Sequence, residues 1–223
     1  MFLTNKWLLC FDLDGTILDS YKEGLRRLLE IARSKNLPMD DSVLKIIKTS
    51  WSKSATSVVS DAWLNTNANE IIEEWERKDA ANPLPFVDGT RETLEKLRKF
   101  FFLGILTNRS RESTLHQLER LGDVFDFIYS AESFPKPHPE SMVNVFKKCQ
   151  ELQINMGHIS YIGDVPEADW QLAQNVNIKF LGVLSGVSTC DDFLKAGLKE
   201  KFIINSIADL PAYYEIDKLT PLR

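Results

Sequence analysis

Six short apolar runs, each followed by small or polar residues, place the strongest constraint on how this chain can fold. Runs that are apolar at every position, rather than at alternate ones, are typical of strands buried on both faces of a parallel sheet. Between them lie stretches in which leucines recur at helical spacing, as at Leu94 with Leu97 and at Leu115, Leu118 and Leu121. Strands that alternate with helices predict an α/β fold, a Rossmann-like doubly wound parallel sheet. The runs are Trp7–Phe11, Phe101–Leu106, Phe125–Tyr129, Ile159–Ile162, Phe180–Leu184 and Phe202–Ile204.

One long segment, residues 18–86, breaks this alternation. It contains helical patterns and no convincing strand, and in its first helix Leu25, Leu28, Leu29 and Ala32 recur on one face. We therefore predict an all-helical module that is inserted after the first strand. The alternative is that these helices pack directly on the sheet. The predicted boundaries are residues 1–17 and 87–223 for the sheet domain and residues 18–86 for the helical module.

Composition and charge exclude several classes of protein. The formal net charge of -5 leaves no basic footprint of the kind that duplex nucleic-acid binders use. The cysteines, Cys10, Cys149 and Cys190, are odd in number and form no Cys-x-x-Cys pair, which argues against a disulfide framework and a zinc cluster. Reduced thiols are typical of a cytoplasmic protein. Asn5 and Lys6 interrupt the first apolar stretch, so neither a signal peptide nor a membrane span is predicted.

Polar residues follow the first two apolar runs. After the first comes Asp12–Thr16 (DLDGT), in which two carboxylates lie on the same side of an extended backbone and repel unless a cation or a shared proton is present. Gly15 lets the chain turn and brings backbone N–H groups towards a bound anion. After the second run come Thr107 and Asn108, a hydroxyl and a backbone amide just ahead of a helix N-terminus, which suits an anion.

Polar residues also follow the third and fourth predicted strands. Lys136 stands in a proline-stiffened stretch, and Gly163 and Asp164 close the fourth run, with Asp169 shortly after. Taken singly, these features have simpler interpretations as solvated side chains, a helix cap or a rigid connector. Ligands of open α/β sheets bind beyond the carboxyl ends of the strands. The coincidence of all four features at that edge therefore predicts one site.

In this order, the four motifs make the chain resemble the haloacid dehalogenase-like hydrolase superfamily. The similarity is greatest to the subgroup of phosphoglycolate phosphatase and β-phosphoglucomutase type, especially in FDLDGTILDS and KPHPE, and residues 18–86 resemble the helical cap of that subgroup. The resemblance implies a magnesium-dependent phosphatase. Its expected substrate is a small phosphorylated metabolite such as phosphoglycolate, a sugar phosphate or a nucleotide, hydrolysed through a phospho-aspartyl intermediate.

The resemblance also implies a role for each motif residue. Asp12 is the expected nucleophile, and Asp14 is expected to protonate the leaving oxygen and then to activate water. Haloacid dehalogenases lack an acid at this position, because a halide needs no proton. Mg²⁺ is expected on the carboxylates of Asp12 and Asp164 and on the backbone carbonyl of Asp14. The expected phosphate-binding residues are Asp12, Leu13, Asp14, Thr107, Asn108 and Lys136, and the supporting residues are Gly15, Thr16, Gly163 and Asp169, of which Asp169 orients Lys136 or a water molecule at the metal.

Two stretches of the helical module carry further expectations. Relatives in this subgroup often have a glycine in the substrate-specificity loop of the cap, and the matching stretch here, residues 48–53, has none. Lys48, Trp51 and Lys53 are candidates for contact with an anionic or ring-bearing substrate. The alternative is that Trp51 packs within the module and both lysines are solvated. The charged run Glu73–Asp79 predicts a solvated helix face with one buried tryptophan.

Two other functions stay open from the sequence. A phosphomutase on the same scaffold would need its phospho-enzyme to survive until a sugar phosphate reorients. A non-catalytic phosphate-binding or signalling module is the second, since receiver domains also combine acidic residues, a hydroxyl and a lysine, although they are shorter and lack a helical insertion. The expected partner is a small phosphate ester, with neither nucleic acid nor membrane, and the protein is expected to be a monomer or a homodimer.

Overall fold

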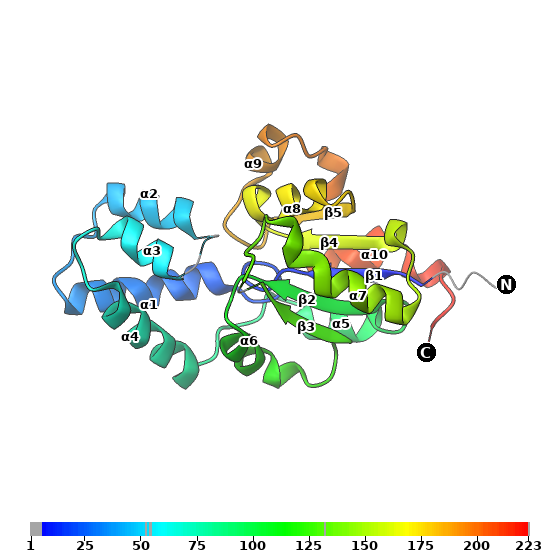
Figure 1. Ribbon diagram of the computed structural model, residues 1–223, viewed down its shortest axis with the longest axis horizontal. Helices are drawn as coiled ribbons and strands as arrows, with labels where there is room; N and C mark the ends of the chain where they lie inside the picture. The colour runs from blue at the N-terminus through cyan, green and yellow to red at the C-terminus, as the bar shows by residue number, and fades with distance from the viewer. Residues whose placement is uncertain (1–5, 52, 54, 132, 223) are drawn as a thin grey trace.

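The computed structural model describes residues 6–51, 53, 55–131 and 133–222. Residues 1–5, which begin the apolar stretch discussed above, lie outside the described residues. Six parallel strands form one sheet in the order β3-β2-β1-β4-β5-β6, with helices on both faces (Figure 1). This confirms the predicted doubly wound α/β fold. The strands are β1 (Leu8–Phe11), β2 (Phe102–Thr107), β3 (Phe127–Ser130), β4 (Ile159–Gly163), β5 (Lys179–Val183) and β6 (Ile203–Ile204), and each coincides with one of the apolar runs.

The sheet is buried on both faces because its strands are apolar at successive positions. In β1, Leu9 and Phe11 enter one hydrophobic cluster, whereas Leu8 and Cys10 enter the cluster on the opposite face. The helices of the sheet domain are α5 (Thr90–Leu97), α6 (Arg111–Leu118), α7 (Val143–Leu152), α8 (Gln171–Asn175), α9 (Cys190–Lys195) and α10 (Leu210–Tyr213), with short turns η1 (Glu119–Leu121), η2 (Pro139–Met142), η3 (Met156–His158), η4 (Pro166–Trp170), η5 (Glu200–Phe202), η6 (Ile207–Asp209) and η7 (Ile216–Lys218).

Helix α6 and the turn η1 bury Leu118 and Leu121, as the leucine spacing predicts, but one position of the pattern differs. The helix begins after Ser110, whose side chain accepts a hydrogen bond from the backbone of Ser113, as an N-cap residue does. Leu115, however, is exposed, although the leucine spacing placed it on the apolar face. The helix buries the polar residue Gln117 instead, because its side chain accepts a hydrogen bond from the backbone N–H of Leu84 in the chain that returns from the helical module.

Residues 18–86 contain helices that pack on one another. They share a hydrophobic cluster of their own, in which Leu28, Ile47 and Ile71 are fully buried. Figure 1 shows this helical module beside one edge of the sheet rather than on either of its faces. Its helices are α1 (Ser20–Ser34), α2 (Asp41–Ser50), α3 (Ala55–Ala62) and α4 (Ala68–Ala81).

Two linkers join the helical module to the sheet domain, and they run side by side. Leu18 of the outgoing linker forms an antiparallel bridge with Phe86 of the returning one. The backbone N–H of Asp19 donates to the carbonyl of Pro85 at 2.9 Å. The chain therefore leaves and re-enters the sheet domain at one narrow junction, directly after the turn of the first motif.

A buried ion pair inside the helical module corrects one prediction. The run Glu73–Asp79 was expected to be a solvated face apart from its tryptophan, but Asp79 is only 8% exposed. Its carboxylate accepts a hydrogen bond from Arg27 of α1 at 2.8 Å, and Arg27 also pairs with Glu23. Two charges can be buried here because each has an oppositely charged partner. Helical periodicity cannot reveal such a partner on another helix.

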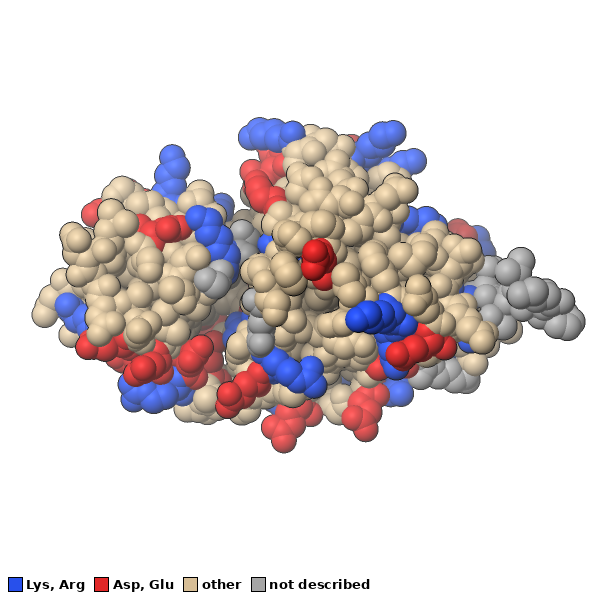
Figure 2. Space-filling view, viewed as in Figure 1, with Lys and Arg blue, Asp and Glu red and all other residues tan. Residues whose placement is uncertain are grey.

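Charged side chains of the helical module gather along its lower edge in Figure 2, where the module and the sheet domain form two lobes. Exposed ion pairs of α1 and α4 join Arg26 to Glu23 and to Glu30, and Lys78 to Glu30. Within the described part of the chain, no helix combines the length and the apolar character that are needed to cross a bilayer.

Candidate active site

The strand register brings the ends of three neighbouring strands together. Phe11 at the end of β1 pairs with Ile105 of β2 on one side and with Ile162 of β4 on the other. The backbone N–H of Asp12 extends this ladder by donating to the carbonyl of Ile162 at 2.8 Å. After β3 the chain crosses to the far side of β1, so this edge is the topological switch point of the sheet, where ligands of such folds bind.

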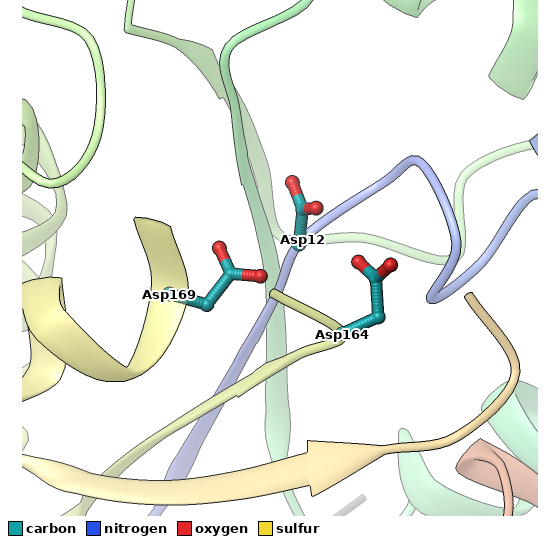
Figure 3. A group of neighbouring side chains, drawn as sticks. All are labelled: Asp12, Asp164 and Asp169. Atoms are coloured by element: carbon teal, nitrogen blue, oxygen red, sulfur yellow. The ribbon is translucent and has the colours of Figure 1, made fainter. Parts of the chain in front are cut away.

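Three buried carboxylates converge at this edge. One oxygen each from Asp12, Asp164 and Asp169 lies within 4.8 Å of the others, and Figure 3 shows Asp12 following β1 between the other two. Burial, together with the charges of Asp169 and Asp12, raises the pKa of Asp164 well above its usual range. Burial also raises the pKa of Asp12 to about 7, with Asp169 adding to the rise and Lys136 opposing it. A cluster of this kind is unfavourable without a cation.

Lys136 lies inside this cluster with its side chain 3% exposed. Its ammonium donates to Asp12 at 2.6 Å, to Asp169 at 2.7 Å and to the hydroxyl of Tyr161 at 2.9 Å. Burial disfavours the charged form, but the two carboxylates outweigh it and raise the pKa of Lys136 above its ordinary value. The second oxygen of Asp169 accepts from the backbone of Val165 at 3.0 Å. Asp169 is therefore committed to holding Lys136 and the start of η4.

Asp164 is arranged differently from Asp169. Its Oδ2 accepts from the backbone N–H of Val187 at 2.9 Å, while its buried Oδ1 has no hydrogen-bond partner among the residues that the structure describes. A buried carboxylate oxygen without a donor is costly, and a hard cation would satisfy it. The donor set is all oxygen, which suits Mg²⁺. The residues present at this site therefore fit a divalent metal ion between Asp12 and Asp164.

The loop after β2 is tied to the lysine loop. The hydroxyl of Thr107 accepts from the backbone N–H of Arg109 at 3.1 Å, which leaves the hydroxyl proton free to donate to a ligand. The Asn108 side chain accepts from the backbone N–H of Lys136 at 2.8 Å and donates to its carbonyl at 3.3 Å. These bonds fix the second and third motifs relative to each other.

Two glycines make room for the carboxylates. Gly15 has a φ of +78°, and a Cβ on it would lie 2.4 Å from the carboxylate of Asp164. A Cβ on Gly163 would lie 2.3 Å from the carboxylate of Asp169. Both positions therefore require glycine for close approach. The other residues of the first turn, Leu13 and Thr16, are fully buried.

A loop after β5 also contributes residues to the site, although the sequence prediction does not include it. The hydroxyl of Ser185 donates to the carbonyl of Gly15 at 2.7 Å, and Val187 binds Asp164 as described above. A Cβ on Gly186 would lie 1.9 Å from the Asp164 carboxylate. The available signal was that serine and glycine follow the fifth apolar run at the same edge of the sheet.

Arg109 is a second residue of the site that the sequence motifs do not mark. Its guanidinium donates to both oxygens of Asp14, at 2.9 and 2.7 Å. Burial raises the pKa of Asp14, but the charge and the hydrogen bonds of Arg109 outweigh it, so the net shift is downward. The signal was an arginine directly after the Thr107–Asn108 pair, and its partner could not be read from the sequence.

The three specificity candidates lie in the helical module. Trp51 packs edge-on against Tyr21, with ring centroids 5.0 Å apart. Lys53 forms an ion pair with Asp61 of α3 at 2.7 Å, and Lys48 is exposed near the end of α2. Among the hydrogen bonds and ion pairs of the described residues, none joins these three side chains to the carboxylate cluster.

Comparisons with known proteins identify relatives of this chain by sequence and by fold. A curated relative, validoxylamine A 7'-phosphate phosphatase from Streptomyces hygroscopicus subsp. limoneus, is 27% identical over 164 residues, which cover 70% of this chain and 76% of that protein. Similar solved structures include a haloacid dehalogenase-like family protein from Streptococcus pneumoniae, with a TM-score of 0.76 and 20% identity over 95% of this chain and 100% of that one. Another is a predicted phosphoglycolate phosphatase from Haemophilus somnus, with a TM-score of 0.74 and 21% identity over 95% and 99%.

At these identities the solved structures show a shared fold. The model of the family described as haloacid dehalogenase-like hydrolase matches residues 9–183, which include all four sequence motifs but end before the loop that holds Ser185 and Val187. Because this match spans most of the chain, the protein belongs to the haloacid dehalogenase-like hydrolase family.

Proposed function

We propose that this protein is a magnesium-dependent phosphatase that hydrolyses a small phosphate ester through a phospho-aspartyl intermediate on Asp12. The observation that carries the proposal is the buried cluster in which Lys136 holds Asp12 and Asp169, while one oxygen of Asp164 has no partner among the described residues. The curated relative, which is named as a phosphatase, supports the same reaction class. The acid at Asp14 favours an ester over a halide, because an ester oxygen needs a proton to leave.

The metal site is proposed from the same residues. The carboxylates of Asp12 and Asp164 and the backbone carbonyl of Asp14 would hold Mg²⁺. When bound, this ion would neutralise the carboxylate repulsion and stabilise negative charge on the phosphoryl oxygens. A solved relative from Bacillus subtilis, which is 20% identical over 95% of this chain with a TM-score of 0.75, is bound to magnesium, and this supports the choice of ion.

Asp12 carries out the first chemical step. One of its carboxylate oxygens forms a bond to phosphorus as the bond to the leaving oxygen breaks, and Asp14 gives that oxygen a proton. Lys136, the Thr107 hydroxyl and the backbone N–H of Asn108 bind the phosphoryl oxygens, where negative charge must be stabilised in the transition state. Asp14 then takes a proton from water as the water oxygen attacks phosphorus. Inorganic phosphate leaves and the Asp12 carboxylate is regenerated.

In this proposal, the helical module acts as a cap. Residues 18–86 would close over the site, exclude bulk water and select the substrate, with Lys48, Trp51 and Lys53 as candidate contacts. A closing cap favours small metabolites over macromolecular substrates. The three free thiols favour a reducing compartment such as the cytoplasm.

Phosphate release from a panel of small phosphate esters tests this proposal. Each ester is assayed with Mg²⁺ and with chelator, using wild type, Asp12→Asn and Asp123→Asn. Asp123 is an exposed aspartate in the loop before β3 and serves as a matched control. We expect Asp12→Asn to lower kcat by a factor on the order of 10⁴ or more, because the nucleophile is lost, while the control resembles wild type.

Three results of that assay would count against parts of the proposal. Turnover that survives in Asp12→Asn would contradict the nucleophile, and turnover in chelator would contradict the metal. A phospho-enzyme that resists water and passes its phosphoryl group to a sugar phosphate would instead indicate a phosphomutase.

A further inference from the structure

We infer that Arg109 is a positioning residue for Asp14 and that it links this carboxylate to the helical module through Asp79. The inference rests on the proposed function, in which Asp14 gives a proton to the leaving oxygen and later takes one from water. It adds to that function a residue outside the motifs and a physical connection between the site and the module.

Arg109 holds the carboxylate of Asp14 with two hydrogen bonds. Arg109 Nε donates to Oδ2 at 2.9 Å and Nη2 donates to Oδ1 at 2.7 Å, so the guanidinium and the carboxylate form a two-bond fork. The Arg109 side chain is 18% exposed and that of Asp14 is 28% exposed, so the pair is largely shielded from water. A carboxylate turns readily about its last torsion, and two parallel bonds to a rigid plane restrict that rotation.

The opposite edge of the same guanidinium faces Ser113 and Asp79. Nη1 donates to the hydroxyl of Ser113 at 2.9 Å and lies 3.6 Å from Oδ2 of Asp79 in α4. The other oxygen of Asp79 accepts from Arg27 of α1 at 2.8 Å. Charges of alternating sign therefore run from Asp14 through Arg109 and Asp79 to Arg27 in the interior of the helical module.

Arg109 is itself held in place by its backbone and by helix α6. Its backbone N–H donates to the hydroxyl of Thr107 at 3.1 Å, and Ser113 lies one helical turn further on in α6. Gln117 of the same helix donates to the backbone carbonyl of Asp79 at 3.5 Å. Arg109 thus stands on the phosphate-binding loop and at the contact between α6 and α4, with both ends fixed.

These contacts have two consequences. The fork holds the ionised carboxylate of Asp14 in one plane, as the removal of a proton from water requires, and a lysine could not reproduce it because an ammonium is a point charge. A movement of α4 changes the separation between Asp79 and Arg109. The position of the helical module therefore acts on the alignment of Asp14 through one guanidinium.

Stopped-flow turnover of 4-nitrophenyl phosphate tests the inference. Nitrophenolate leaves without a proton, so phosphorylation of Asp12 does not need Asp14, whereas hydrolysis of the phospho-enzyme does. For Arg109→Gln we expect the first release of nitrophenolate at the wild-type rate and a steady state about 10- to 100-fold slower, seen as a burst. The substitution is expected to lower kcat and to leave the binding of substrate unchanged. Arg111→Gln, an exposed arginine at the start of α6, is the matched control and keeps the wild-type trace.

Two further variants separate positioning from a merely structural role. Free guanidinium ion at millimolar concentration is expected to restore part of the steady-state rate of Arg109→Ala, because it can occupy the vacated fork. Asp79→Asn is expected to slow the steady state in the wild-type background and to have little additional effect in Arg109→Gln, because both act through one guanidinium.

The inference is overturned if a folded Arg109→Gln protein turns over like wild type, or if its burst and its steady state slow by the same factor. Additive effects of Asp79→Asn and Arg109→Gln would overturn the link to the module. A wild-type protein without Asp12-dependent release of nitrophenolate would overturn the proposed function itself, and this inference with it.

Discussion

At the scale of single residues, the two outer carboxylates of the cluster differ in what holds them. Both carboxylate oxygens of Asp169 accept hydrogen bonds from protein donors, one from Lys136 and one from the backbone of Val165. Only one oxygen of Asp164 accepts a hydrogen bond, from the backbone of Val187, and within the described part of the chain the other oxygen has no partner. The short loop after β5 therefore decides which carboxylate can serve a metal ion, although no residue of that loop has a charge.

Gly186→Ala is expected to weaken magnesium binding. The new Cβ would lie 1.9 Å from Oδ2 of Asp164, so either the carboxylate or the loop must move. Loss of an orienting contact to a metal ligand typically costs about 10- to 100-fold in affinity. The measurement is the rise in Tm on titration with MgCl₂, which should need correspondingly higher concentrations. Gly157→Ala, whose Cβ would meet nothing closer than 3.4 Å, should keep the wild-type titration; an unchanged titration in Gly186→Ala would contradict the prediction.

At the scale of elements, helix α6 binds the linker that returns from the helical module through Gln117, a polar side chain on a buried face. Gln117 is 1% exposed and accepts from the backbone N–H of Leu84 at 2.8 Å. This bond satisfies a backbone donor at the point where the chain re-enters the sheet domain, at a position that the leucine pattern of the helix does not mark.

Gln117→Leu is expected to destabilise the protein by about 1–3 kcal/mol. The leucine fills the same space but leaves the N–H of Leu84 buried without an acceptor. Urea unfolding gives the free energy of unfolding, and Gln150→Leu on the exposed face of α7 is the control with little expected change. Equal effects of the two substitutions would show that the hydrogen bond is not the cause.

Helix α1 contributes an ion pair whose effect depends on pH. Hydrogen bonds from Arg26, opposed in part by burial and aided by Arg27, lower the pKa of Glu23 to about 2. Because the folded-state pKa lies below the unfolded value of about 4.3, the contribution is complete above that value and is lost as the pH falls towards about 2. Glu23→Gln is therefore expected to cost about 1 kcal/mol in urea unfolding at neutral pH. Near pH 2 the cost should approach zero; a cost independent of pH would exclude the ion pair as its source.

At the scale of the whole molecule, the chain has two separate apolar interiors. One is the cluster of the helical module, and the other consists of the clusters on the two faces of the sheet. The linkers that join them pair with each other through Leu18 and Phe86. In the proposed function, this arrangement would let the helical module move about its junction as a cap without disturbing either interior.

Ile71→Ala is expected to loosen the helical module alone. Ile71 is fully buried in the module cluster, and truncating such a side chain typically costs about 2–5 kcal/mol. Amide hydrogen exchange should accelerate in α1–α4 and stay unchanged in β1–β5. Ile162→Ala in the sheet is the reciprocal control. Acceleration across the whole chain in both variants would show one cooperative unit and would contradict the division at residues 18 and 86.

The amino-acid sequence by itself determined the sheet and the order of its polar loops. Each strand appears as a continuous apolar run because a strand of a doubly wound sheet is buried on both faces, so the signal is local. Asp12, Thr107 and Asp164 stand at or just after the ends of these runs, and parallel strands end at the same edge of the sheet, whereas Lys136 stands further along its loop. Asp12 and Asp164 could therefore be placed together before any coordinates were known, and their catalytic roles follow from the proposed function.

Only the tertiary structure decided which polar side chains are paired across the fold. The fork between Arg109 and Asp14, the bond from Val187 to Asp164 and the buried pair of Arg27 with Asp79 each join segments that are far apart in sequence. A charged or polar residue has the same local pattern whether it is solvated or buried, because its environment is set by a partner that the pattern does not contain. For this reason the sequence predicts a solvated Asp79 and assigns no role to Arg109, whereas the apolar strands lie where the sequence predicts them.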